Sequence, residues 1–219
     1  MVHNMNETDR MMDFYTYFAS PVYITEKPEF IKDINIVANE YTHKFLKNNK
    51  VDEIYPIIQT ENFSGDIRIP DFQNFISDCA LSILDSQGYY MEDKEINVGD
   101  MWLHVHYKTS SMEKHTHGFN SQLTGFYFLE CPENSSRIII HDPRTGKAQV
   151  ELQEKNINDI SLASHMINFE PKPGMLFIGP SWLPHSLTRN VSEEPVKFIH
   201  FNVYTYFSNK RQCEMPEII

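Results

Sequence analysis

Cysteine, basic residues and long apolar runs are scarce in this sequence, and each scarcity excludes a class of protein. The 219 residues include only 3 cysteines, which fit neither a disulfide framework nor a zinc cluster. The formal net charge of -11 makes the phosphate backbone of nucleic acid an unfavourable partner. No apolar stretch approaches the roughly 20 residues of a membrane-spanning helix, and the N-terminus has no apolar signal region. We therefore expect a cytoplasmic protein with reduced thiols.

The periodicity of the sequence changes along the chain and predicts one domain with two parts. Apolar residues spaced three or four apart predict two helices, one beginning at Pro28 and one at Pro70. From residue 95 onward, apolar and polar residues alternate as they do on strands. We expect one domain over residues 1–219, in which residues 1–94 contribute an N-terminal strand and helices that pack on a β core of residues 95–208.

Turn-forming proline, glycine, asparagine and aspartate residues separate the predicted strands. Strands are expected at residues 14–25, 102–107, 122–130, 137–141, 165–170, 174–179 and 195–206. The polar residues 47–69, between the two helices, are expected to form loops. Strands in this number after two helices are typical of a β-sandwich or barrel buttressed by helices.

Three histidines have the placement expected of ligands to one metal ion. His115 and His117 are separated by one residue, so on a strand both imidazoles point to the same side. His185 follows a short apolar strand that begins at Gly174. Neutral imidazole is the commonest protein ligand of transition metals, and three protein ligands leave positions open for a substrate or O₂. The pattern therefore predicts a catalytic metal site.

Other residues near these histidines have two interpretations each. His104 and His106 lie on one face of a predicted strand and either orient the metal ligands or pack as polar residues inside the barrel. Asp142 precedes a proline and favours a turn, but it is also the nearby carboxylate that would complete a site of two histidines and one carboxylate.

The order of short motifs along the chain resembles a known family. The motifs are Phe18-Ala-Ser-Pro-Val-Tyr, His115-Thr-His117, Leu123-Thr-Gly-Phe-Tyr127-Phe, Asp142-Pro-Arg144, Pro173-Gly-Met-Leu-Phe, Ser181-Trp-Leu-Pro-His185 and Phe201-Asn202. In this order they resemble the 2-oxoglutarate/Fe(II)-dependent oxygenases common in marine bacteria and their phages. The resemblance spans about residues 14–206. It implies a mainly β fold, the double-stranded β-helix of jelly-roll or cupin-like proteins, with Fe(II) at the barrel mouth.

The resemblance also implies the ligands and the co-substrate. His115 and His185 take the positions of the two metal-binding histidines. His117 stands where the family usually has a carboxylate, so the third ligand is His117, Asp142 or water, and we expect His117. The implied co-substrate is 2-oxoglutarate, and the implied reaction is oxidation, such as hydroxylation, of a small molecule or a protein side chain.

The distal carboxylate of 2-oxoglutarate needs a hydroxyl group and a cation. The family has an arginine at the position of Val196, so this chain must use another cation. We expect Tyr127 with either Lys197 or Arg189, because a buried carboxylate is costly unless it is paired.

Two other functions compete with this one. A cupin-type metalloprotein with three histidine ligands and no 2-oxoglutarate would also have the Gly174–Pro180 spacing, with Gln122 near the expected carboxylate position. A barrel with a decayed, non-catalytic site is the third alternative. The sequence leaves the oligomeric state open, with a homodimer among the expected assemblies.

Overall fold

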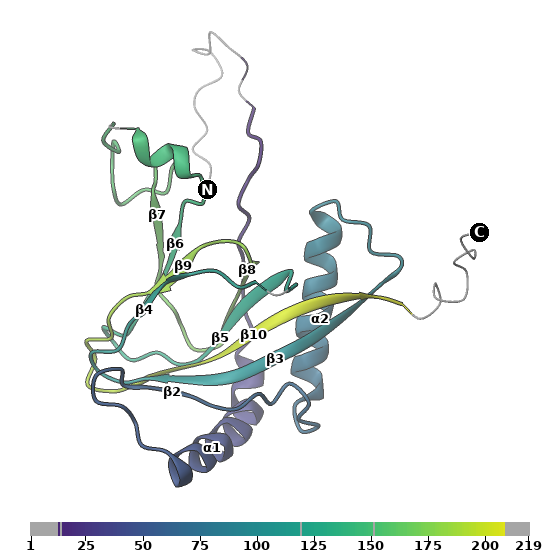
Figure 1. The fold of residues 1–219 in the computed structure, drawn as a ribbon, viewed down its shortest axis with the longest axis vertical. Helices are drawn as coiled ribbons and strands as arrows, with labels where there is room; N and C mark the ends of the chain where they lie inside the picture. The colour runs from purple at the N-terminus through teal and green to yellow at the C-terminus, as the bar shows by residue number, and fades with distance from the viewer. Residues whose placement is uncertain (1–12, 14, 119, 151, 209–219) are drawn as a thin grey trace, which may run out of the picture.

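Two antiparallel sheets and two long helices form the computed structural model, which describes residues 13, 15–118, 120–150 and 152–208 (Figure 1). The large sheet has six strands in the order β1-β8-β5-β10-β3-β2, and the small sheet has four in the order β4-β9-β6-β7. The strands of the large sheet are β1 (Tyr23–Glu26), β8 (Met175–Pro180), β5 (Leu123–Glu130), β10 (Val196–Phe207), β3 (Lys94–His106) and β2 (Ile57–Gln59). Those of the small sheet are β4 (Met112–His115), β9 (His185–Leu187), β6 (Ile138–His141) and β7 (Met166–Phe169). The mainly β fold expected from the sequence is confirmed.

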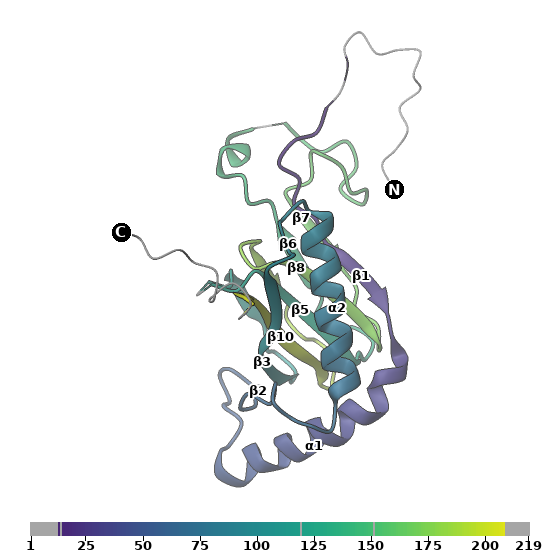
Figure 2. The same ribbon diagram turned by 90° about the vertical axis from the view of Figure 1, so that its right-hand side faces the viewer.

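The two helices cover one face of the large sheet (Figure 2). A 3₁₀ turn (Pro28–Phe30) leads into α1 (Ile31–Asn48), and α2 (Pro70–Ser86) has its proline in the first turn, where no backbone N–H donor is needed. Buried side chains of both helices form a core with one face of β3, β5 and β10. This layer confirms the predicted helices. None of the described helices is long and apolar enough to cross a membrane.

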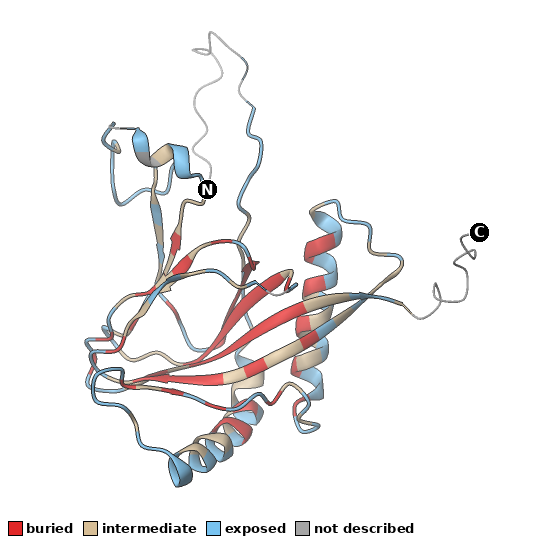
Figure 3. Ribbon diagram, viewed as in Figure 1, coloured by how far each residue is buried: buried red, intermediate tan, exposed pale blue. Residues whose placement is uncertain are grey.

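A second core lies between the two sheets. It contains Phe126 and Phe128 of β5, Phe198 of β10, Ile138 of β6 and Leu187 of β9. Because β5 and β10 lie between this core and the helices, they are buried on both faces, and the alternation of polar and apolar residues is lost along them (Figure 3). The face of the large sheet that looks toward the small sheet is called the inner face below.

The corner before β8 shows why a glycine is required there. Gly174 has a φ of +83°, a backbone conformation that residues with a side chain rarely adopt. Its carbonyl accepts a hydrogen bond of 2.7 Å from the backbone N–H of Lys27. A β-carbon at this position would lie 2.8 Å from Cα of Pro28. The corner thereby connects the start of the first helix to the large sheet.

Two segments differ from the sequence expectation. Of the opening strand expected at residues 14–25, residue 14 lies outside the described residues, and the strand that forms is Tyr23–Glu26, which pairs with β8. The expected loop at residues 47–69 contains β2, which pairs with the end of β3. Short strands such as β2, β4 and β9 are stabilised by pairing with neighbouring strands, and their own sequences are too short to show an alternation of polar and apolar residues. Cys79 and Cys131 are free thiols, and Cys213 lies outside the described residues.

Candidate metal centre

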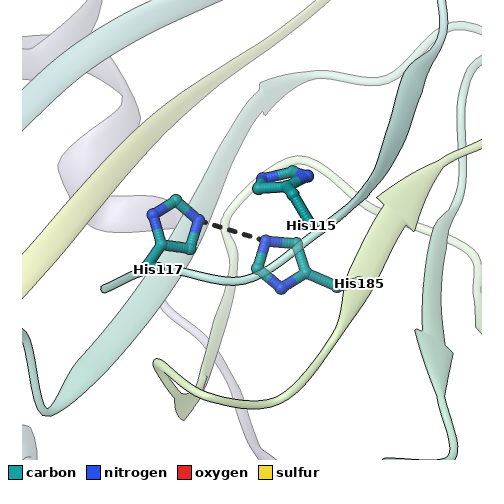
Figure 4. Close-up of side chains that lie close together, drawn as sticks. All are labelled: His115, His117 and His185. Carbon is teal, nitrogen blue, oxygen red and sulfur yellow. Dashed lines mark hydrogen bonds between the residues drawn. The ribbon is translucent and has the colours of Figure 1, made fainter.

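Strand pairing in the small sheet brings together histidines that are far apart in the sequence. His115, the last residue of β4, lies directly opposite His185, the first residue of β9. His117 follows two residues after the end of β4, and its backbone N–H donates a hydrogen bond of 2.8 Å to the carbonyl of Ser181. This bond, rather than the strand alternation that the sequence suggested, fixes the backbone at His117. The three side chains meet at one place (Figure 4).

The three imidazoles have the spacing that a single ion requires. One ligand nitrogen from each of His115, His117 and His185 lies within 4.8 Å of the other two. The Nε2 atoms of His117 and His185 are 3.2 Å apart (Figure 4). Two nitrogens that each lie about 2.1 Å from one ion at right angles are about 3 Å apart, so this pair already has a suitable separation.

Backbone carbonyls set the orientation of two of these rings. Nδ1 of His115 lies 2.7 Å from the carbonyl oxygen of Glu113, and Nδ1 of His185 lies 3.0 Å from that of Leu183. A carbonyl only accepts, so each Nδ1 carries the proton and donates it. The Nε2 atom of each ring therefore keeps its lone pair for a metal, as is usual for histidine ligands.

Burial keeps His117 and His185 uncharged before a metal binds. Desolvation is the main cause that lowers the pKa of His117 from 6.5 to about 4, and the neighbouring His115 lowers it further. Desolvation also lowers the pKa of His185 to about 3, against the opposing effect of its hydrogen bond to Leu183. Neutral imidazoles are the form that binds metals. The donor set therefore fits a divalent transition metal such as Fe(II).

The carboxylate considered as an alternative ligand is engaged elsewhere. Oδ2 of Asp142 lies 2.7 Å from Nη2 of Arg144 and 3.2 Å from Nζ of Lys147. The hydrogen bond from Arg144 is the main cause that holds the pKa of Asp142 well below its ordinary value. Among the described residues, the group able to hold a metal ion comprises His115, His117 and His185, without Asp142.

The structure does not bring the residues expected at the distal carboxylate of 2-oxoglutarate to this centre. The Tyr127 hydroxyl donates to the carbonyl of Lys27 at 2.6 Å, and its ring packs on Phe72 of α2, on the helix side of the large sheet. Lys197, near the start of β10, forms a salt bridge of 2.9 Å with Glu130 at the end of β5, and Arg189 is exposed. Strand alternation is the reason: on β5 and β10 the inner face carries Phe126, Phe128 and Phe198 instead.

A second group of histidines lines the inner face beside the centre. His104 and His106 on β3 and His200 on β10 are all buried. The His200 ring lies 4.6 Å from the His117 ring, and the His104 ring lies 5.9 Å from the His200 ring, measured between centroids. The sequence had left His104 and His106 open and had not singled out His200. It lies two residues after Phe198 and so shares its face of β10, but a strand buried on both faces does not reveal from its sequence which face that is.

Comparison with protein families finds a match that includes the metal centre. Residues 100–202, which include all three histidines, match the family described as "Putative 2OG-Fe(II) oxygenase". This part of the chain is similar to a 2OG-Fe(II) oxygenase barrel. A comparison with curated protein sequences finds no match.

Solved oxygenase structures share the fold. A prolyl-4-hydroxylase from Pseudomonas putida has a TM-score of 0.56 at 12% identity, with 84% of this chain and 92% of that chain covered. The α-ketoglutarate-dependent carbocyclase SnoK of nogalamycin biosynthesis has a TM-score of 0.58 at 10% identity, with 90% and 87% covered. A prolyl hydroxylase from Trichoplax adhaerens, solved with a peptide of hypoxia inducible factor, has a TM-score of 0.52 at 12% identity, with 90% and 87% covered. At such low identities, the TM-scores show a common fold, the double-stranded β-helix.

The family match and the shared fold together give the class of enzyme and its cofactors. The protein is a 2-oxoglutarate/Fe(II)-dependent oxygenase, as the sequence resemblance implied. Its cofactors are Fe(II) and 2-oxoglutarate, and the three-histidine centre fits the iron.

Proposed function

We propose that this oxygenase is a hydroxylase whose Fe(II) is held by His115, His117 and His185. The observation that carries the proposal is the convergence of three ligand nitrogens within 4.8 Å inside the barrel that matches the oxygenase family. Bound Fe(II) supplies the activation of O₂, which is reduced as 2-oxoglutarate is converted to succinate and CO₂ and one oxygen atom enters a C–H bond of the substrate. The substrate is a small molecule or a protein side chain.

The residues of this chain orient the metal ligands and keep water away from one side of the centre. The carbonyls of Glu113 and Leu183 fix two imidazoles with Nε2 toward the ion, so little reorganisation is needed on binding. The Phe126 ring lies 5.4 Å from the His185 ring and borders the apolar core between the sheets. An apolar wall at this place excludes water from one side of the centre, which protects reactive species from side reactions.

A donor set of three imidazoles also favours a second candidate, the cupin-type metalloprotein that does not use 2-oxoglutarate. Gln122, which was considered as its carboxylate equivalent, accepts a hydrogen bond of 2.7 Å from the Thr205 backbone through Oε1. Its Nε2 donates a hydrogen bond of 2.6 Å to the carbonyl of Asn120, so both ends of the amide are engaged away from the metal centre. The oxygenase is therefore the better-supported function, and binding of 2-oxoglutarate distinguishes the two.

The test is reconstitution of the anaerobic protein with Fe(II), followed by addition of 2-oxoglutarate and O₂. We expect about one iron per chain and slow conversion of 2-oxoglutarate to succinate in the absence of substrate. His185→Ala should abolish both iron binding and succinate formation, while His141→Ala, a histidine that bonds Ser186 instead, should retain both. Iron binding without any binding of 2-oxoglutarate at millimolar concentration would instead support the cupin-type alternative.

A further inference from the structure

Several buried nitrogen atoms on the inner face have no hydrogen-bond partner. They are Nδ1 of His104, both ring nitrogens of His106 and Nδ1 of His200. A buried polar atom without a partner costs roughly 1–3 kcal/mol, so native proteins rarely keep one unless water or a ligand satisfies it. A group of such atoms on one face is a candidate site for a polar ligand.

The hydrogen bond between Trp102 and His104 shows what kind of ligand is needed. Nε1 of Trp102 lies 2.5 Å from Nε2 of His104. The indole N–H can only donate, so Nε2 of His104 accepts and its proton must be on Nδ1. Nδ1 of His104 is therefore a buried N–H donor that lacks an acceptor. A neutral His106 also carries one N–H, so the pair offers two donors.

His106 lies next to the position at which the related oxygenases have an arginine for the distal carboxylate. It lies directly opposite Val196 across the ladder between β3 and β10, and both residues are 0% exposed. Val196 is apolar, and no lysine or arginine in the described part of the chain is buried. An anion that enters this space must be held by neutral N–H donors.

We propose that His104 and His106 donate hydrogen bonds to the distal carboxylate of 2-oxoglutarate. The inference rests on the proposed function, in which 2-oxoglutarate binds beside the ion at His115, His117 and His185. The five-carbon chain of 2-oxoglutarate, with C–C bonds of about 1.5 Å, spans about 5 Å between its carboxyl carbons. The His200 ring lies between the metal centre and His104, at 4.6 Å from His117 and 5.9 Å from His104. The co-substrate would run past this ring.

A second metal ion does not explain the same atoms. In the described chain, the group of His115, His117 and His185 brings three ligand atoms within 4.8 Å of one another, and His104, His106 and His200 form no such group. The pKa of His106 is lowered to about 4 by burial, so the free protein presents it as a neutral donor. Charge-assisted hydrogen bonds to a carboxylate are stronger than those between neutral groups, which suits two neutral donors to one anion.

The experiment compares 2-oxoglutarate with 2-oxopentanoate, in which a methyl group replaces the distal carboxylate. Calorimetry with the anaerobic Mn(II)-loaded full chain gives Kd for each ligand without turnover. We expect the wild type to bind 2-oxoglutarate more tightly, and His106→Phe to weaken 2-oxoglutarate about ten- to a hundredfold while leaving 2-oxopentanoate nearly unchanged. His106→Gln keeps an N–H donor and should retain most of the preference. His141→Phe is the matched control because His141 bonds Ser186 instead.

The outcomes separate the two proposals. If the wild type binds 2-oxoglutarate preferentially and His104→Phe and His106→Phe keep that preference, the anchor is elsewhere and the proposed function stands. Equal affinity for the two ligands also overturns the anchor. A metal-loaded wild type that binds neither ligand contradicts the proposed function itself.

A measurement on the unmutated protein covers the case in which the phenylalanine variants do not fold. With ¹⁵N-histidine labelling and Zn(II), the imidazole resonances of His104 and His106 should shift on addition of 2-oxoglutarate but not of 2-oxopentanoate. Resonances that respond equally to both ligands, or to neither, overturn the inference.

Discussion

Nε2 of His117 lies 3.2 Å from Nε2 of His185, although 68 residues separate the two in the chain. Two imidazole nitrogens this close either share a proton or share a metal ion. Because His185 donates its Nδ1 proton to Leu183, its Nε2 atom is the acceptor of the pair. A metal ion bound by both Nε2 atoms therefore requires His117 to carry its proton on Nδ1, which leaves a lone pair on each Nε2.

Removal of either histidine should therefore remove the metal. We expect His117→Ala and His185→Ala to weaken metal binding by more than the 10- to 100-fold that loss of an outer-sphere partner causes. The measurement is the metal content after dialysis at fixed free Fe(II) or Co(II), with His141→Ala as the control. Full occupancy in either variant shows that the residue is not a ligand.

Asp142 should be dispensable for metal binding. Its carboxylate is paired with Arg144 and Lys147 rather than directed at the centre, so Asp142→Asn should keep the metal content of the wild type. Since Arg144 is largely exposed, the stability change should stay within about 1 kcal/mol. Metal loss in Asp142→Asn, with His117→Ala still loaded, would instead identify a site of two histidines and one carboxylate.

The metal-free protein should lose stability in mild acid. Burial lowers the pKa of His106 from 6.5 to about 4 and that of His104 and His200 well below 6.5. The unfolded chain therefore binds more protons than the folded chain between pH 6.5 and pH 4, so the free energy of unfolding falls as the pH falls through this window. The protonation of His106 alone should lower the free energy of unfolding by on the order of 3 kcal/mol across this window. Urea unfolding across this range is the measurement, and His106→Phe should show a flatter dependence if it folds.

The packing between β5 and the helix side of the sheet leaves no room for a side chain at Gly125. A β-carbon there would lie 2.2 Å from Cζ of Phe201 and 2.8 Å from the backbone oxygen of Phe177. We expect Gly125→Ala to lower the free energy of unfolding by about 1–3 kcal/mol, since the backbone oxygen cannot move aside freely. Gly65→Ala is the control, because nothing lies within 4 Å of its β-carbon, and its denaturation midpoint should shift little. Equal midpoints for the two variants would contradict the close packing.

The sequence by itself was sufficient to predict the two long helices and to select three histidines as candidate metal ligands. The apolar spacing that begins at Pro28 and Pro70 was sufficient to predict both helices, because a helix buries one face whatever lies opposite it. The placement of His115, His117 and His185 was sufficient to predict a metal centre that the three-dimensional arrangement fits. Residue type and chemistry limit which side chains can bind a metal, and both can be read from a sequence.

Only the tertiary structure decided which face of each strand meets which neighbour. Tyr127 and Lys197 were expected beside the co-substrate, but the register of β5 and β10 directs Tyr127 toward α2 and pairs Lys197 with Glu130. A strand buried on both faces has no alternation in its sequence, so the side that faces the centre cannot be read from it. The alignment of His106 with Val196 depends on that same register. Hydrogen bonds between strands distant in the sequence set the register, and no local pattern encodes them.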